Sequence, residues 1–254
     1  MKIIGALEKA LLILDKFSFE KPEWSLAELT RELGWSKPTV LRLLNTLEKY
    51  GFVNKNSTTK KYHLGLRLFD LGSIVAGQMD VRAIALPVMR KIRDKINEAV
   101  YLNVILEKER VCVEFLDCSH TLKASVNIGQ RSPLYVGASA LVLLAFHEDR
   151  ERIIRELELK PFTPTTITDV ETLFHRLEEI RQAGYAISWG ERNMGLVAIS
   201  APVFDRHGKI AASLSIGLPE VRAQKEKLEL CIKLLQWGGG EISSQLGHQA
   251  CKLD

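Results

Sequence analysis

At 254 residues, with 46% hydrophobic and 26% charged side chains, the chain has the length and composition of a soluble globular protein with two domains. No apolar run approaches the roughly eighteen residues that a membrane span requires. Charged residues at positions 8, 9 and 15 interrupt the apolar N-terminal stretch, so a cytoplasmic protein that does not bind membranes is predicted. The net charge of +4 is concentrated in residues 1–70, which hold 12 Lys and Arg against 8 Asp and Glu.

Two helices are predicted near the N-terminus. Apolar residues recur at helical spacing between Leu7 and Phe17 and predict the first helix. Ser25 and Glu28 have the spacing of a capping box, in which a hydroxyl and a carboxylate each bond to the backbone at the start of a helix. Gly34 is suited to the left-handed conformation that ends a helix. The second helix is therefore predicted to end at Gly34.

A third helix and a hairpin follow. Ser36 is predicted to cap this helix, Pro38 fits its first turn because no backbone donor is needed there, and Gly51 closes it. Two short runs, residues 52–55 and 61–65, are joined by a polar turn and predict a β-hairpin. The arrangement is that of a winged helix-turn-helix, predicted for residues 1–65.

The third helix is the predicted DNA reader. The second helix of a helix-turn-helix lies in the major groove, where base edges can be distinguished. Residues 35–67 carry seven basic side chains and one acid, as a phosphate-facing surface requires. Arg42 can bond to a guanine edge and Asn45 to adenine, while the hairpin lysines reach the phosphate backbone. The predicted contacts with double-stranded operator DNA are Ser36, Lys37, Thr39, Arg42, Asn45, Thr46, Lys49, Lys55, Lys60 and Lys61.

The remainder of the chain predicts a second domain. Residues 66–80 read as a linker helix, and residues 81–254 as a mixed α+β domain with a central antiparallel sheet. The predicted strands are residues 99–107, 110–117, 122–128, 196–205 and 209–218, and the predicted helices lie near 85–96, 137–146, 168–184 and from 227 onward.

Two segments carry a family resemblance. The run "WSLAELTRELGWSKPTVLRLLNTLEKYGFV", followed by "KYHLGLRLFDLG", resembles the DNA-binding domain of the IclR family of bacterial transcriptional regulators. The run "GYAISWGERNMGLVAISAPVFD" resembles the C-terminal signature of that family, with Gly184, Ser188 and Glu191 at its spacing. The resemblance extends from about residue 6 to residue 246.

The resemblance implies a GAF-like effector-binding domain and a function. Members of the family are ligand-controlled repressors or activators that form homodimers, in some cases tetramers as dimers of dimers. Their small-molecule effectors are mostly organic or aromatic carboxylates. The positions that match the effector pocket of the family are Gly137, Ala138, Ser139, Ser188, Leu196, Ala198, Ser215 and Gly217.

The chain departs from the family pattern inside this pocket. Ser188, Ala198 and Gly217 stand where members that bind oxo-acids tend to have an acid, a cysteine and a serine. Ala140 and Leu141 replace a common glycine-lysine pair. These changes imply a roomier and less polar pocket, and they favour a larger or aromatic carboxylate.

No catalytic residue, metal site or cofactor is predicted. The six histidines are scattered, and the chain has no nucleophile elbow, phosphate-binding glycine loop or HExxH motif. Cys112, Cys118 and His120 lie close in sequence but match no standard zinc spacing. Two alternatives stay open: a protein-binding helix-turn-helix on a dimer scaffold, and a hydrolase with an accessory DNA-binding domain. A steep loss of DNA affinity with salt would exclude the first alternative, and inertness to ester substrates would count against the second.

Overall fold

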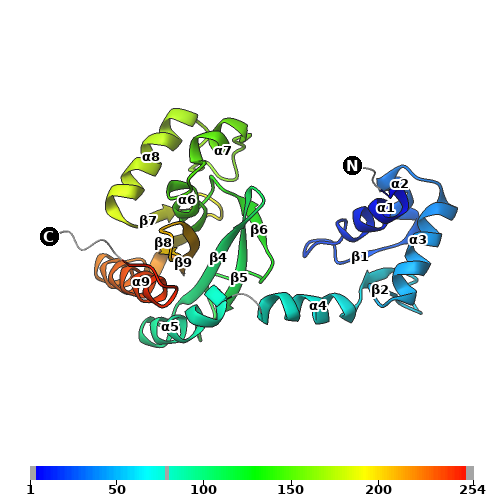
Figure 1. Cartoon of the computed structure of the whole chain (residues 1–254), viewed down its shortest axis with the longest axis horizontal. Coiled ribbons are helices and arrows are strands. Elements are labelled where there is room, and N and C mark those ends of the chain that lie inside the picture. Colours follow the sequence, from blue (N-terminus) through cyan, green and yellow to red (C-terminus); the bar gives the residue numbers. More distant parts are fainter. Residues whose placement is uncertain (1–3, 78–79, 250–254) are drawn as a thin grey trace. The chain divides into compact units, whose positions relative to one another are not determined.

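The computed structural model describes residues 4–77 and 80–249, and the chain forms two compact units, residues 1–78 and 79–254 (Figure 1). Each unit has its own hydrophobic core. Within the described ranges no single helix is long and apolar enough to cross a membrane. The bent pair Leu66–Val75 and Asp80–Ile96 passes this test of length and composition only when its two helices are counted together.

The N-terminal unit is a winged helix-turn-helix, as predicted. A small antiparallel sheet in the order β1-β3-β2 lies beside its helices, and the hairpin of β2 and β3 is the wing. In chain order the unit comprises α1 (Gly5–Leu14), β1 (Glu23–Trp24), α2 (Leu26–Leu33), α3 (Lys37–Lys49), β2 (Val53–Lys55), β3 (Tyr62–Leu64) and α4 (Leu66–Gly77).

Local signals determine where α2 begins and ends. The Glu28 N–H donates to Ser25 Oγ at 3.2 Å, and the Ser25 N–H donates to Glu28 Oε2 at 2.8 Å, which completes the predicted capping box. Gly34 ends the helix with a φ of 68°. The start of α3 differs from the prediction: Ser36 occupies the cap position, but its hydroxyl bonds to Thr39 Oγ1 at 2.8 Å and not to a backbone N–H.

The C-terminal unit is an α+β domain built on a six-stranded antiparallel sheet in the order β6-β5-β4-β9-β8-β7. In chain order it comprises α5 (Asp80–Ile96), β4 (Ala99–Leu106), β5 (Glu109–Leu116), β6 (Arg131–Pro133), α6 (Ala138–Ala145), α7 (Arg150–Glu156), α8 (Val170–Ala183), β7 (Ala186–Trp189), β8 (Leu196–Phe204), β9 (Ile210–Pro219), the 3-10 turn η1 (Glu220–Arg222) and α9 (Lys225–Gln245).

The two faces of this sheet have different coverings (Figure 1). Along β9, Leu214, Ile216 and Leu218 belong to the core beneath α5 and α9. Because side chains alternate along a strand, Ser215 and Gly217 face the opposite side, where α6, α7 and α8 enclose a second core. Small residues on that side of β9 leave room between the sheet and α6.

The predicted strand at residues 122–128 is wrong. This segment has no ladder pairing and crosses the edge of the sheet as irregular chain. A turn follows, in which the Gly129 N–H donates to the Cys112 carbonyl at 2.7 Å and the Cys112 N–H donates to the Gln130 carbonyl at 3.1 Å. The short strands β6 and β7 were not predicted.

Candidate functional site

The helix α3 has one apolar face and one polar face. Val40 and Leu44 are buried in the core of the unit. Arg42, Asn45 and Lys49 are exposed and, at spacings of three and four residues, lie on the same face of the helix. These side chains are therefore available to a partner along the whole length of the helix.

The hydroxyl groups near α3 are more constrained than the cations. Ser36 and Thr39 bond to each other, and Thr46 Oγ1 donates to the Arg42 carbonyl at 3.0 Å. The Thr46 hydroxyl proton is therefore engaged within the helix, although its oxygen can still accept. Lys37 is exposed at the first turn.

The wing presents the remaining predicted lysines. Lys55, Lys60 and Lys61 are all exposed on the hairpin. Asn56 Oδ1 accepts from the backbone N–H groups of Thr58 and Thr59, at 2.8 and 3.0 Å, and so shapes the turn. Because the turn is bonded internally, the lysines project from a defined scaffold.

The positive charge of α3 and the wing is not neutralised within the unit. In its described residues the ion pairs are Lys16–Glu32 at 3.0 Å and Lys21–Glu28 at 3.4 Å, and both involve α2. The six cations of α3 and the wing have no carboxylate within ion-pair distance there. A cationic surface of this kind attracts a polyanion and favours the release of its counterions.

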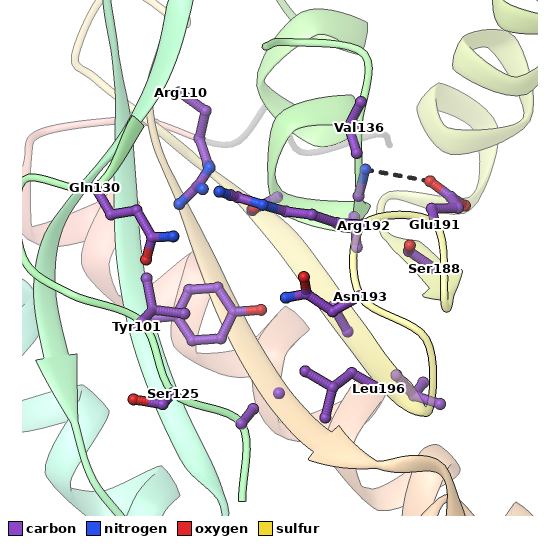
Figure 2. A pocket seen from close by; sticks show the side chains of 18 residues that line it. Tyr101, Arg110, Ser125, Gln130, Val136, Ser188, Glu191, Arg192, Asn193 and Leu196 are labelled. Atoms are coloured by element: carbon purple, nitrogen blue, oxygen red, sulfur yellow. Dashed lines mark hydrogen bonds between the residues drawn. The ribbon is translucent and has the colours of Figure 1, made fainter. Parts of the chain in front are cut away.

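A cavity lies in the C-terminal unit between the sheet and α6 (Figure 2). Strands β4, β5, β8 and β9 form its floor, and the N-terminus of α6, residues 124–126 and the loop at residues 190–195 surround it. Its volume is about 80 Å³, which corresponds to roughly five to eight water-sized groups. The cavity thus suits a compact molecule.

The structure brings most of the predicted effector residues together. Seven of the eight predicted residues line the cavity: Gly137, Ala138, Ser139, Ser188, Leu196, Ala198 and Gly217. Ser215 does not line it: this residue is fully buried beneath the cavity, where its hydroxyl bonds to Ser200 Oγ at 2.8 Å.

Several polar residues of the cavity were missed by the sequence analysis. They are Tyr101, Arg110, Gln130, Arg192 and Asn193. Figure 2 shows that Arg110 and Arg192 approach the same space from opposite sides, with Gln130 and Tyr101 beside them. The sequence implied a pocket less polar than that of members that bind oxo-acids, and these polar residues were not part of that prediction. The sequence did carry one signal for Arg110: it is a charged residue directly before the apolar run "VCV" of a predicted strand.

Glu191 lies at the end of the cavity nearest α6. Its carboxylate is nearly buried and accepts the Gly137 N–H at 3.2 Å. Burial raises the pKa of this carboxyl, while the bonds from Gly137 and Ser188 act in the opposite direction. The Glu191 carbonyl accepts the hydroxyls of Thr163 and Thr166, at 3.1 and 2.6 Å, which fasten the loop to its surroundings. Through these contacts Glu191 holds the loop at residues 190–195 in place.

The cysteine and histidine side chains considered for metal binding make separate contacts with other residues. Cys112 is buried in β5 and its thiol donates to the Glu114 carbonyl at 3.4 Å. His120 lies 3.3 Å from the Asn97 amide. Over the described part of the chain, no three His, Cys, Asp or Glu side chains form a group that could hold a metal ion.

Known proteins match both units. Residues 6–57 match the IclR helix-turn-helix domain, and residues 74–244 match the family described as bacterial transcriptional regulator IclR C-terminal. The HTH-type transcriptional regulator KipR of Bacillus subtilis is 34% identical over 242 residues, which cover 94% of this chain and 96% of KipR.

Solved structures share the fold. An IclR-type transcriptional regulator from Alicyclobacillus acidocaldarius has a TM-score of 0.86 at 29% identity, covering 97% of this chain and 100% of its own. An IclR homologue from Microbacterium hydrocarbonoxydans, crystallised with 4-hydroxybenzoate, has a TM-score of 0.80 at 23% identity, covering 95% and 98% of the two chains. These similarities extend over both units.

Proposed function

Because the chain belongs to the IclR family of bacterial transcriptional regulators, we propose that its N-terminal unit binds operator DNA under the control of a small organic acid. The acid occupies the cavity of the C-terminal unit. The observation that carries the proposal is the presence, in one chain, of an uncompensated cationic helix face and of a cavity with two arginines. Control requires that the acid bind the DNA-competent and free states with different affinities.

In this proposal α3 lies in the major groove. Arg42 donates two hydrogen bonds to a guanine edge, and Asn45 pairs with adenine. The wing lysines and the residues at the start of α3 contact phosphates, which set the position of the helix without reading the sequence. These cations are exposed and form no ion pair within the described part of the N-terminal unit, which supports such roles.

The base-reading role of Arg42 predicts a loss of specificity. Arg42→Ala should reduce discrimination between a selected operator and random duplex by about 1–3 kcal/mol, because a bidentate base contact is lost. Titrations of both duplexes at one salt concentration measure this ratio. The control is Lys95→Ala, which removes an exposed cation from α5 of the other unit. An unchanged ratio in Arg42→Ala would remove this residue from base readout.

The phosphate role of Lys61 predicts a different pattern. Lys61→Ala should lower the affinity for operator and for random DNA by the same factor. It should also reduce the slope of log affinity against log salt concentration by about 1, because one fewer counterion is released. Titrations at several salt concentrations give the slope. A parent-like slope would show that the wing does not reach the backbone at this position.

A homodimer is part of the proposal, since two recognition helices are needed to read two half-sites. The N-terminal unit exposes large apolar side chains on α1 and α4, and such patches mark association surfaces. On these two helices they include Leu7, Leu11, Leu66 and Phe69.

The effector is proposed to be a compact organic or single-ring aromatic acid. The guanidinium groups of Arg110 and Arg192 favour an anion in the cavity. The complex of the Microbacterium relative with 4-hydroxybenzoate supports an aromatic acid as one member of this class. A gel-shift screen of organic acids against the selected operator tests the control, and it fails if no acid alters operator affinity.

A further inference from the structure

Arg110 is a buried cation whose hydrogen bonds go to neutral groups. The residue is 3% exposed and belongs to β5. Its Nε donates to Ser132 Oγ at 2.7 Å, and its Nη1 donates to Asn103 Oδ1 at 2.9 Å. A guanidinium carries five N–H donors, so part of its capacity is left for another acceptor. The remaining side of the group faces the cavity (Figure 2).

In the part of the chain that the structure describes, no carboxylate pairs with Arg110; Glu191, the carboxylate among the cavity-lining residues, bonds to the Gly137 N–H instead. The ionisable groups that act on it are Arg192, Tyr101 and Cys112, and among the described residues no carboxylate lies within ion-pair distance of it. Burial, and to a smaller extent the neighbouring Arg192, lower the pKa of Arg110 to about 10, so the group is still charged at neutral pH. A buried charge without a partner is unfavourable. The site is therefore incomplete without an anion.

A relay of buried polar side chains holds Arg110 in place. Asn103 Nδ2 donates to Ser213 Oγ at 3.4 Å and to Ser215 Oγ at 3.3 Å, and Ser215 bonds to Ser200. These four residues are fully buried and span three neighbouring strands of the sheet. The guanidinium is thus oriented before any ligand arrives, which reduces the entropy lost on binding.

Arg192 approaches from a different element. It lies in the loop between β7 and β8, which begins at Gly190 and ends at Gly195, both with positive φ. Its Nη2 donates to the Arg131 carbonyl at 3.4 Å. Figure 2 shows the guanidinium of Arg192 close to that of Arg110 at the cavity.

We propose that Arg110 is the residue that binds the carboxylate of the effector, with Arg192 as its second contact from the loop. The body of the acid then extends toward Tyr101, Leu196 and Gly217 at the less polar end of the cavity. This inference rests on the proposed function and specifies it: the site selects acids against their neutral amides. Planar guanidinium groups match a carboxylate with paired, charge-assisted hydrogen bonds.

The test compares acids with their amides on the full-length chain. Pyruvate, lactate, benzoate and 4-hydroxybenzoate are screened by thermal shift beside the corresponding primary amides, and Kd values are then measured by calorimetry. At least one acid should raise the Tm of the parent, while its amide should not. Arg110→Gln should raise the Kd of that acid at least about 30-fold, because a charged partner of the ligand is lost.

Two further variants separate a ligand-binding role from a structural one. Arg155→Gln, which makes the same change at an exposed position of α7 that does not line the cavity, should leave the Kd of the acid near that of the parent. Arg110→Gln without ligand should keep or raise the Tm, since it removes an unpaired buried charge; a clear fall in Tm would make Arg110 a structural residue and overturn the inference.

The outcomes also separate the inference from the proposed function. If an acid binds Arg110→Gln as tightly as the parent and still alters operator affinity, the carboxylate role of Arg110 is wrong and control by an acid stands. If no acid in the panel binds the parent or alters its operator affinity, both the inference and acid control are wrong.

Discussion

Replacing Arg222 by methionine is expected to lower the free energy of unfolding of the C-terminal unit by about 3–5 kcal/mol. The guanidinium of Arg222 donates to both oxygens of Glu98, at 2.8 and 2.7 Å, and to the Leu122 carbonyl at 2.9 Å. Glu98 is fully buried. Its other cation, Lys227, lies 3.9 Å away and cannot replace two direct bonds, so the variant leaves a buried carboxylate poorly paired.

Urea unfolding of the full chain, followed by far-UV circular dichroism, measures this loss. The matched control is Arg152→Met, because Arg152 pairs with Asp149 at 2.6 Å where both side chains are well exposed. That variant should cost less than about 1 kcal/mol. The double variant Glu98→Met with Arg222→Met should recover most of the stability, since no buried charge is left. If Arg222→Met costs no more than Arg152→Met, the buried pair does not hold this unit together.

The pair also shows why part of the fold lay beyond the sequence. Glu98 and Arg222 are 124 residues apart, and neither has a local pattern that identifies the other. The irregular segment at residues 122–128 depends on the same kind of contact: Arg222 binds its Leu122 carbonyl, and Ala124 turns toward the cavity. Alternating apolar residues predicted a strand there, but the ladder partner that a strand needs is absent from this edge.

The N-terminal unit was predictable because its signals are local. Ser25 and Glu28 are three residues apart and complete their own cap, and Gly34 ends the same helix through its own backbone conformation. The buried and exposed faces of α3 follow from helical spacing alone. Each feature was therefore determined by a window of fewer than about fifteen residues.

The cavity was predicted in part: some of its residues could be found from the sequence and others could not. Gly137, Ser188 and Gly217 were placed at it by family resemblance, and the structure does bring them together. Arg110 and Arg192 were missed because neither stands at a position that the resemblance assigned to the pocket. Strand alternation does put Arg110 on the same side as the buried Cys112, so a charge at an inward position was the only local sign.

Gly65→Ala is expected to destabilise the N-terminal unit by about 3 kcal/mol or more, at the upper end of overpacking costs. A Cβ on Gly65 would lie 2.0 Å from the Gly51 carbonyl oxygen and 2.8 Å from its carbon. Both atoms belong to the backbone, so no side chain can move aside. The Gly65 N–H also donates to the Phe52 carbonyl at 2.9 Å, and this bond holds the end of the wing against the end of α3.

Melting of the full chain by circular dichroism, together with operator titration, measures the effect. Gly72→Ala is the control, because a Cβ on that glycine of α4 meets no atom within 4 Å. Alanine there should be neutral or stabilise the helix by up to about 1 kcal/mol. Operator affinity should fall in Gly65→Ala and stay near the parent value in Gly72→Ala.

The location of the damage decides what the result means. The two units have separate cores, so Gly65→Ala should lower the Tm of the N-terminal unit only. A bound acid should still raise the Tm of the C-terminal unit as it does in the parent. Loss of operator binding with retained acid binding would assign the two functions to different units. If DNA affinity survived although the N-terminal transition fell, the folded wing and the face of α3 would not be the DNA-binding surface.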